Sequence, residues 1–482
     1  VKSNNKKLKV MKKLILLMLT FACTFCNAQT SEINRTNHWY FGEGIGIDYS
    51  SGSPVLDTSS SMFQREACAV MSDTAGNLLF YTDGDTIWNK NHIVMNNGFG
   101  LGCESSSNGA VIVPNPGNDS IYYLFTVDCW ENIGNHGLRY SVINVNANGG
   151  TGALLQKNIQ LFSPSSEQLA VTRHCNGIDY WVVMHHYNQN KFYSYLVTPS
   201  GVNAIPTISV VGDTLPVQNF IGNVGSMCFS PNGEKLCFVN GYIGARLFNF
   251  NLLTGEIDNM IVLSTVRYEY GCAFSPDNLK LYVTFSGYPT PGRYISQYDV
   301  TSNDSLLITS SKNIVFLVSY VHAPLEGLQL TKQGYIKVAF YYRDSIGVIL
   351  NPNAYGAACN YQTFPLTFNG RLCKEQFPNF NTNYYNSNPY SCGIGIAETE
   401  NTSIKFFPNP VSDKLTLTNL KGKYKYLNIY SIDSRHVLFR RIDFTDEAII
   451  DISRFPSGIY LIQLVQNTQS EVKSIKFIKS NF

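Results

Sequence analysis

Carboxylates are the side chains of this 482-residue chain with the clearest potential for chemistry. A glycosidase holds two of them on either side of the bond that it cleaves. No spacing singles out a pair among the four that are available, Asp128, Glu131, Glu167 and Glu326. The chain has no Gly-x-Ser-x-Gly nucleophile turn, and no cysteine has an evident histidine partner. We therefore assign no catalytic residue from the sequence.

Two adjacent histidines, His185 and His186, are the residues best suited to bind a transition metal, and His174 and Cys175 lie nearby. Adjacent residues of a strand point to opposite faces of its sheet. The two histidines therefore cannot readily share one ion, and we expect them to flank a sheet. We predict no metal site.

Three further motifs are short and weak. Residues 42–46 are rich in glycine but lack the strand-to-helix setting of a dinucleotide-binding loop, so we expect a bend in an edge strand. Residues 73–77 and 83–85 contain aspartates, yet neither gives the ligand series of an EF-hand. We expect solvated turns there, and we predict no cofactor.

Aromatic side chains are numerous near the expected loops. Such rings can stack on sugars, but in an all-β domain most of them pack between sheets. The candidates are Trp88, Tyr122, Tyr123, Trp130, Tyr268, Tyr270 and Tyr288.

The composition favours strands over helices. Aromatic residues make up 13% of the chain, mainly as 30 Tyr and 29 Phe, which favour β-structure, while 37 Gly supply turns. The fold class predicted is all-β. The net charge is only +2 and no basic stripe appears outside the two termini, so nucleic acid is not an expected partner.

The first 28 residues have the pattern of an export signal. Five lysines between residues 6 and 13 precede an apolar run at 14–25, and small residues lead to a cleavage site between Ala28 and Gln29. A lipoprotein anchor at Cys23 is the competing interpretation, although Thr20-Phe21-Ala22 precedes it poorly. No other stretch is long and apolar enough to be a membrane helix. We expect no transmembrane segment in the mature chain.

A hairpin recurs along the chain. Residues 227–239 match residues 272–284, and each copy places a Ser-Pro-Asn or Ser-Pro-Asp turn between two strands, with Ser230 and Ser275 45 residues apart. Looser copies have their turns near residues 72, 115, 172 and 331, so the spacing is about 43 to 58 residues. That spacing is typical of four-stranded β-propeller blades.

Six hairpins are visible, and a seventh blade could be shared between residues 39–48 and 359–380. Strands from both ends of the chain would then close the ring and remove an exposed sheet edge. We predict a seven-bladed propeller over residues 37–380. Rings of six or eight blades, or a stack of β-sandwiches, are the alternatives.

Ten cysteines lie outside the signal, scattered without a Cys-x-x-Cys pair, and export would expose them to an oxidising compartment. In the hairpin at residues 227–239, pairing Ser230 with Lys235 places Cys228 opposite Cys237. Directly opposed residues have Cβ atoms about 4.5–5.5 Å apart, somewhat more than a relaxed disulfide prefers. We expect the two cysteines to be close and leave a bond between them open.

The front of the mature chain carries Asn37-His-Trp-Tyr-Phe-Gly42, then Gly76-Asn-Leu-Leu-Phe-Tyr-Thr-Asp-Gly84 and Ser105-Ser-Ser-Asn-Gly-Ala-Val-Ile-Val-Pro114. These motifs resemble the WYFG-type propeller of large surface proteins of Bacteroidota. The resemblance covers about residues 39–380. It implies the propeller fold, but the family has no settled activity to carry over.

A second resemblance covers residues 402–482, after an Asn/Tyr/Ser-rich linker expected at residues 381–401. The segment resembles the type A C-terminal sorting domain of the type IX secretion system, an Ig-like β-sandwich. The residues that carry the resemblance are Pro408, Asn409, Pro410, Gly458, Tyr460, Lys476 and Lys479. The resemblance implies that the type IX machinery is a partner and that the chain crosses the outer membrane.

These observations predict a secreted or cell-surface propeller, without catalytic activity, that acts in adhesion or in binding an extracellular glycan or protein. The alternative is a secreted hydrolase or lyase that acts on polysaccharide through the central cleft of the propeller.

Overall fold

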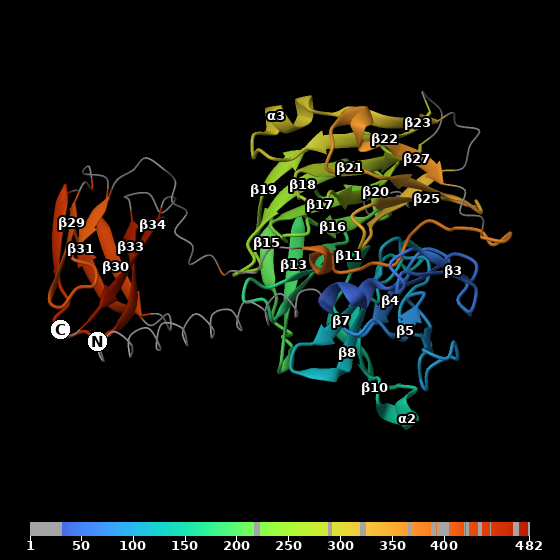
Figure 1. The fold of residues 1–482 in the computed structure, drawn as a ribbon, viewed down its shortest axis with the longest axis horizontal. Helices are drawn as coiled ribbons and strands as arrows, with labels where there is room; N and C mark the ends of the chain where they lie inside the picture. The colour runs from blue at the N-terminus through green and yellow to red at the C-terminus, as the bar shows by residue number, and fades with distance from the viewer. Residues whose placement is uncertain are drawn as a thin grey trace, which may run out of the picture. The chain divides into compact units, whose positions relative to one another are not determined.

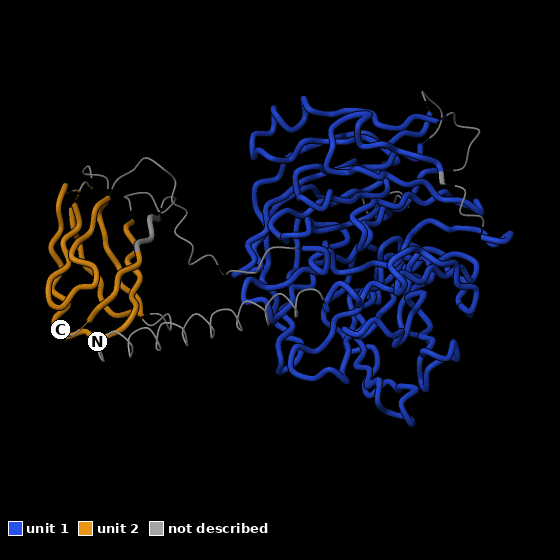
Figure 2. Tube along the Cα trace, in the orientation of Figure 1, with its two compact units in different colours: residues 1–390 blue, residues 391–482 orange. Residues whose placement is uncertain are grey.

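The chain divides into two compact units, residues 1–390 and 391–482 (Figure 2). The structure is a computed structural model. It describes residues 31–215, 222–287, 292–318, 324–364, 368–386, 392, 404–418, 420, 424–431, 436–443, 445–465 and 472–480. The expected signal peptide, with Ala28 and Gln29, lies outside these residues.

The described residues of the first unit form seven antiparallel sheets, one after another along the chain. Their strands run from blue to orange in Figure 1. Alternating apolar residues and Gly/Asn/Asp turns produce short strands that pair with their sequence neighbours. Blade 1 comprises β1 (His38–Phe41), β2 (Ile45–Asp48) and β3 (Val55–Asp57). Blade 2 comprises β4 (Ala69–Ser72), β5 (Leu78–Thr82) and β6 (Ile87–Asn89). Blade 3 comprises β7 (Ala110–Asn115), β8 (Asn118–Thr126), β9 (Leu138–Asn144) and β10 (Ala153–Phe162).

The other four blades have four or five strands each. Blade 4 comprises β11 (Ser165–Arg173), β12 (Tyr180–His186), β13 (Lys191–Thr198), β14 (Gly201–Val202) and β15 (Thr207–Val210). Blade 5 comprises β16 (Met227–Phe229), β17 (Lys235–Asn240), β18 (Gly244–Phe250) and β19 (Ile257–Val262). Blade 6 comprises β20 (Glu269–Phe274), β21 (Lys280–Phe285), β22 (Arg293–Asp299) and β23 (Asn313–Val318). Blade 7 comprises β24 (Leu325–Leu330), β25 (Ile336–Phe340), β26 (Ile346–Ile349) and β27 (Tyr361–Phe364).

Helical segments are few and short in the described residues. They are η1 (Ile33–Thr36), η2 (Trp130–Asn132), α2 (Ala147–Gly150), α3 (Ser305–Ser310), η4 (Gly356–Cys359) and η5 (Thr382–Tyr385). A search of the described residues for a helix of membrane-spanning length and apolarity gives none.

Successive blades pack face to face through separate apolar clusters, which arranges them as a ring. Clusters join blade 2 to 3, 3 to 4, 4 to 5, 5 to 6 and 6 to 7. One further cluster joins blade 1 to both blade 2 and blade 7, since it contains Trp39, Val70 and Ala339. Burial of these faces is the dominant stabilising contribution. The predicted seven-bladed propeller is therefore confirmed.

The ring is closed by residues 372–386, which we call the axial segment. Its backbone bonds to blade 1 through Glu43 N–Leu372 O (3.0 Å) and to blade 7 through Gly327 N–Glu375 O (2.7 Å). The expected sharing of one blade between residues 39–48 and 359–380 is wrong, because the described strands of blade 1 all lie within residues 38–57 and the outer strand β27 belongs to blade 7. Residues 359–380 instead reach blade 1 through contacts such as Glu43 N–Leu372 O.

The axial segment then continues through the centre of the ring. Asn379 donates to the carbonyls of Asn108 (3.4 Å) and Leu169 (3.0 Å), in blades 3 and 4. Asn383 accepts a hydrogen bond from Thr172 Oγ1 (2.6 Å) and donates to Pro231 O (2.6 Å). Residues 381–386, which we expected in the linker, therefore belong to the propeller, because their side chains satisfy buried polar groups of the inner strands.

The repeated hairpins form the two inner strands of blades 2 to 7. In blade 5 the register is Met227 to Phe238, Cys228 to Cys237 and Phe229 to Leu236, as the sequence predicts. The structure shows no bond between the sulfurs of Cys228 and Cys237. The Sγ of Cys228 instead lies 3.3 Å from the Sγ of Cys272 in blade 6, across the interface between the blades.

The second unit is a sandwich of two antiparallel sheets. One comprises β28 (Lys405–Phe407), β29 (Lys414–Thr418) and β32 (Glu447–Asp451). The other comprises β30 (Tyr426–Ser431), β31 (His436–Arg441), β33 (Gly458–Val465) and β34 (Val472–Lys479). Its core, which includes Leu415, Leu427, Ile450 and Ile462, is separate from those of the propeller. This architecture is that of an Ig-like domain.

Candidate functional site

A polar cavity of about 430 Å³ opens at one mouth of the ring. Its lining residues lie at the starts of the inner strands and in the loops that connect the second and third strands of a blade, such as Gly241 in blade 5. Its charged and aromatic lining residues are Arg65, Glu66, Trp130, Glu131, Glu167, Tyr268, Glu269, Tyr270, Glu326 and Glu375. The axial segment fills the ring behind it, so the cavity is a blind mouth.

The fold explains why glutamates gather there. Glu66 and Glu167 lie seven residues before Asp73 and His174, where the hairpin turns of their blades begin. Glu269 lies six residues before the turn residue Ser275, and Glu326 lies five residues before Thr331. Because each hairpin starts at the same end of the ring, a glutamate five to seven residues before the turn reaches the mouth in each of these four blades. Glu375 is added by the axial segment. This recurrence is a signal in the sequence that our carboxylate search did not use.

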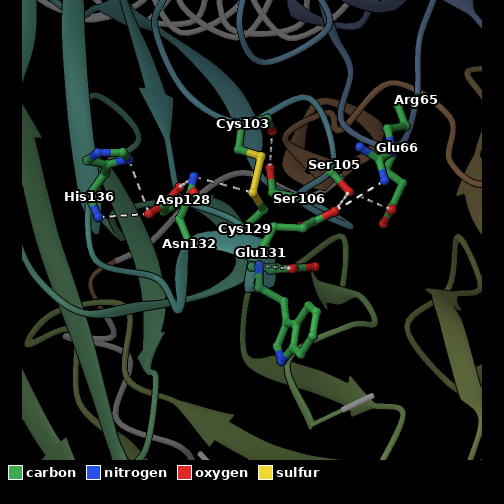
Figure 3. Close-up of a disulfide and its surroundings, with 12 residues drawn as sticks. Arg65, Glu66, Cys103, Ser105, Ser106, Asp128, Cys129, Glu131, Asn132 and His136 are labelled. Atoms are coloured by element: carbon green, nitrogen blue, oxygen red, sulfur yellow. Dashed lines mark hydrogen bonds and ion pairs between the residues drawn. A yellow bond between two sulfur atoms is a disulfide. The ribbon is translucent and has the colours of Figure 1, made fainter. Parts of the chain in front are cut away.

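A chain of hydrogen bonds crosses the cavity between three blades and the axial segment. Arg65 donates to Glu131 Oε1 (3.1 Å), and Ser105 Oγ bridges Glu131 Oε1 (2.8 Å) and Glu66 Oε1 (3.2 Å) (Figure 3). The Tyr270 hydroxyl, from blade 6, lies 2.9 Å from Glu375 Oε2 and 3.4 Å from Glu66 Oε2. These bonds fix the orientation of the carboxyl groups.

A disulfide holds the loop that carries Trp130 and Glu131. Cys103, before β7, is bonded to Cys129, directly after β8 and before η2 (Figure 3). Behind this loop, Glu167 accepts hydrogen bonds from the Trp130 backbone N–H (2.6 Å) and from the Ser107 hydroxyl (2.6 Å). The wall of the cavity between blades 3 and 4 is therefore rigidly built.

The carboxyl groups of the cavity hold protons more tightly than free glutamates. Burial, followed by the charge of Glu375, raises the pKa of Glu66 and that of Glu326 well above the ordinary value. Burial raises the pKa of Glu167 to about 8 and that of Glu269 to about 7. Desolvation and repulsion between neighbouring carboxylates both disfavour the ionised form, so these carboxyl groups bind protons more readily. At neutral pH the cavity therefore offers both acceptors and proton-bearing carboxyls.

Aromatic rings complete the cavity. Trp130 is half-buried, and Tyr268 is 44% exposed at a left-handed backbone position with φ of 68°. Tyr122 and Tyr123 are instead buried between blades, and Trp88 stacks on Tyr81 at 5.6 Å. Tyr288 lies outside the described residues. Of the seven aromatic candidates, three line the cavity.

The structure brings together three of the four carboxylates named from the sequence, Glu131, Glu167 and Glu326. Asp128 does not line the cavity. Its carboxylate is fully buried and accepts hydrogen bonds from Asn132 Nδ2 (2.9 Å) and the His136 backbone N–H (2.8 Å), which fold the loop after β8 (Figure 3).

The two adjacent histidines point to opposite faces of β12, as predicted. His185 stacks on Phe238 of blade 5 at 5.0 Å, while His186 packs against Phe162 of blade 3 at 5.2 Å. Each ring therefore fills a different interface between blades.

The three turn motifs have structural roles. Residues 42–44 form the tight connection of the β1–β2 hairpin and residues 45–46 begin β2, so the segment is not a bend in an edge strand. A side chain at Gly42 would meet Leu372 O at 2.5 Å. Asp73 accepts from the Asn77 backbone N–H (2.8 Å) in the β4–β5 turn. Asp83 accepts from the Thr86 N–H (2.7 Å), but it is buried rather than solvated, with its pKa raised to about 6 by that burial.

One serine, histidine and aspartate occur together outside the cavity. His38 Nδ1 lies 3.0 Å from Ser72 Oγ, and His38 Nε2 lies 3.7 Å from Asp48 Oδ1. Ser72 is completely buried, so no substrate can reach its hydroxyl. The arrangement is a packing contact between blades 1 and 2, and it is not a nucleophile site.

The sorting-motif residues of the second unit cluster around its last strand. Asn409 Oδ1 accepts from the Ile478 backbone N–H (2.8 Å), and Gly458 pairs with Lys479. Tyr460 is buried against Phe477 and donates to Pro456 O (2.8 Å). Lys479 is buried and Lys476 is exposed. The motif thus joins the start of the domain at Pro408 and Pro410 to its final strand.

Residues 405–479 match the secretion system C-terminal sorting domain. The domain is the export signal of type IX secretion, and it directs the chain to the cell surface or the extracellular space. The exported part is the β-propeller. No curated protein matches the sequence.

Several solved structures resemble the chain at low identity. PorZ, a surface component of the type IX secretion system of Porphyromonas gingivalis, is 11% identical with a TM-score of 0.32, over 92% of this chain and 74% of that one. Hsv2 of Kluyveromyces lactis is 10% identical with a TM-score of 0.37, over 65% and 90%. Regucalcin of Agrobacterium tumefaciens, a calcium-binding protein, is 11% identical with a TM-score of 0.31, over 64% and 81%. We infer no activity from them.

Proposed function

We propose that this exported propeller is a non-catalytic binding protein that takes an extracellular glycan at the mouth of its ring. One observation carries the proposal: the cavity combines aromatic rings with a connected set of carboxyl and hydroxyl groups. Sugars are bound by that combination, since rings stack on their apolar faces while carboxylates accept from their hydroxyls. A protein ligand, bound through its hydroxyl or amino groups, is the other outcome that a binding screen can give.

The pre-formed hydrogen-bond chain supports binding. Tyr270, Glu66 and Glu375 already orient one another, so a ligand would not need to order them. The axial segment prevents passage through the ring and leaves a recess for the end or the bend of a chain. A propeller that binds an extracellular glycan in such a recess would serve adhesion.

A second candidate function is cleavage of a polysaccharide, either by hydrolysis or by the elimination reaction of a lyase. It is favoured by burial, which raises the pKa of Glu66 well above its ordinary value and that of Glu167 to about 8, because a carboxyl that keeps its proton near neutral pH is what a general acid requires. Ionised carboxylates in the same cavity would then act as the base. Turnover of a bound glycan would distinguish this candidate from simple binding.

The test is a glycan array probed with the exported protein, followed by titration calorimetry and a turnover assay on each hit. We expect Trp130→Ala to weaken binding of the selected glycan about tenfold and Tyr270→Phe to weaken it about threefold, for a lost stacking contact and a lost hydrogen bond. Glu256→Gln is the matched control, because Glu256 is exposed in the β18–β19 turn at the opposite end of blade 5. Unchanged glycan affinity in Trp130→Ala and Tyr270→Phe would contradict the proposal. Release of a cleaved product in the turnover assay would favour the second candidate.

We also propose that residues 1–28 are removed as a signal peptide, with cleavage between Ala28 and Gln29. Basic, apolar and small residues in that order support it. Intact-mass measurement of periplasmic material should give a chain that begins at Gln29. A lipid-modified chain that begins at Cys23 would show the competing anchor instead.

A further inference from the structure

Three thiols gather between blades 5 and 6. Cys228 lies on β16, Cys237 on β17 and Cys272 on β20. Cys237 and Cys272 are buried in the apolar cluster between the two blades, and Cys228 packs against it. The Sγ atoms of Cys228 and Cys272 are 3.3 Å apart, so they touch across the interface.

We propose that Cys228 and Cys272 are joined by a disulfide in the exported protein, which cross-links the inner strand of blade 5 to that of blade 6. A disulfide has an S–S distance of about 2.05 Å. Starting from 3.3 Å, the two sulfurs need to approach by about 1.3 Å to form the bond.

The alternative bond, Cys228 to Cys237, is less favourable. These residues are direct partners across the β16–β17 hairpin, and Cβ atoms in such pairs lie about 4.5–5.5 Å apart, beyond the distance of about 3.8 Å that a relaxed disulfide prefers. The Sγ of Cys272 lies 3.3 Å from the Sγ of Cys228, and 3.9 Å from the backbone carbonyl oxygen of Cys237. The cross-link between the blades therefore competes best for Cys228.

Export exposes the cysteines to conditions in which a disulfide can form. Export takes the chain out of the reducing cytoplasm, and the propeller already contains the Cys103–Cys129 disulfide. In the reaction, the two thiols lose two protons and two electrons and form one S–S bond. The electrons reduce the disulfide of a thiol–disulfide exchange protein to its dithiol, so atoms and electrons balance.

The timing follows from burial. Burial raises the pKa of the Cys228 and Cys272 thiols well above the ordinary value, while the thiolate is the form that reacts. We therefore expect the bond to form while the interface between the two blades is still open, during folding outside the cytoplasm. Once formed, it closes a loop of 44 residues and restricts the unfolded chain.

Tryptic peptides separate the three thiols. Cleavage after Lys191, Lys235, Arg246, Arg267 and Lys280 places Cys228 in residues 192–235, Cys237 in 236–246 and Cys272 in 268–280. The exported protein is alkylated under denaturing conditions without reduction, digested and analysed by mass spectrometry. We expect peptide 192–235 linked to peptide 268–280. Recovery of both peptides singly alkylated, or of 192–235 linked to 236–246, would overturn the proposal.

Two variants provide an internal comparison. Cys272→Ser should abolish the cross-linked peptide, leave Cys228 available to alkylation and lower the Tm by a few degrees. Cys237→Ser, the matched control from the same cluster, should keep the cross-link. Loss of the linked peptide in Cys237→Ser but not in Cys272→Ser would contradict the assignment.

Discussion

At the scale of single residues, the mouth of the ring is built by repetition. A glutamate five to seven residues before the hairpin turn is harmless in one blade, but four blades bring Glu66, Glu167, Glu269 and Glu326 to one place. Crowded carboxyls in a desolvated site raise one another's pKa. The carboxyl groups of the cavity therefore keep protons at a higher pH than free glutamates do, and the stability of the propeller depends on pH.

Glu269 tests this dependence, because its carboxyl is fully buried in the wall of the cavity. Burial raises its pKa from 4.5 to about 7, so the folded state binds more protons than the unfolded state. The stability that this provides is complete below about pH 4.5 and is lost as the pH rises through 7. Its size is on the order of 3 kcal/mol.

The measurement is urea unfolding of the protein at pH 5 and pH 8. We expect Glu269→Gln to lower the difference between the two free energies of unfolding, while the other buried glutamates keep part of it. Glu256→Gln, which changes an exposed glutamate, should leave the difference as in the wild type. An unchanged difference in Glu269→Gln would show that this carboxyl is already ionised in the folded protein.

At the scale of elements, local patterns and long-range contacts were not equally predictable. The Ser230-Pro-Asn turn determines its own hairpin, so the blades and the Cys228–Cys237 register follow from nearby residues. The axial segment is different, because Asn379 and Asn383 resemble loop residues until the ring surrounds them. Their partners lie 152 to 271 residues away in the chain. No local pattern indicates such contacts.

The cavity was only partly predictable, because its residues come together through contacts between distant parts of the chain. Glu131, Glu167 and Glu326 are evident as carboxylates, but only the circular order of the blades shows that they are neighbours. Glu375 reaches the site through the axial segment, so it could not be assigned from its surroundings in the sequence.

Asn383 gives the sharpest test of the axial segment. Asn383→Ala leaves the hydroxyl of Thr172, the backbone N–H of Arg173 and the carbonyl of Pro231 without their partner in a buried site. We expect a loss of about 2–4 kcal/mol in the free energy of unfolding. The control Asn303→Ala removes an exposed side chain that accepts from Lys235, and it should cost less than about 0.5 kcal/mol. Equal effects in urea titrations would argue against an embedded axial segment.

At the scale of the whole molecule, the propeller and the sandwich have separate hydrophobic cores. The sandwich core around Leu427 and Ile462 contains no propeller residue, and the propeller clusters contain no residue of the sandwich. We therefore expect the chain without residues 402–482 to fold as a propeller. Its Tm should lie within about 2 °C of the propeller transition in the full chain, measured by calorimetry. A large fall in Tm would mean that the propeller needs the second unit.

The central claim is that residues 405–479 carry a folded propeller to the outside of the cell. Fractionation of cells that possess type IX secretion tests it most directly, with the full chain and the chain that lacks residues 402–482 compared side by side. We expect the full chain at the surface or in the medium, accessible to added protease, and the truncated chain folded in the periplasm and protected. Arrival of the truncated chain at the surface in normal amounts would contradict the account.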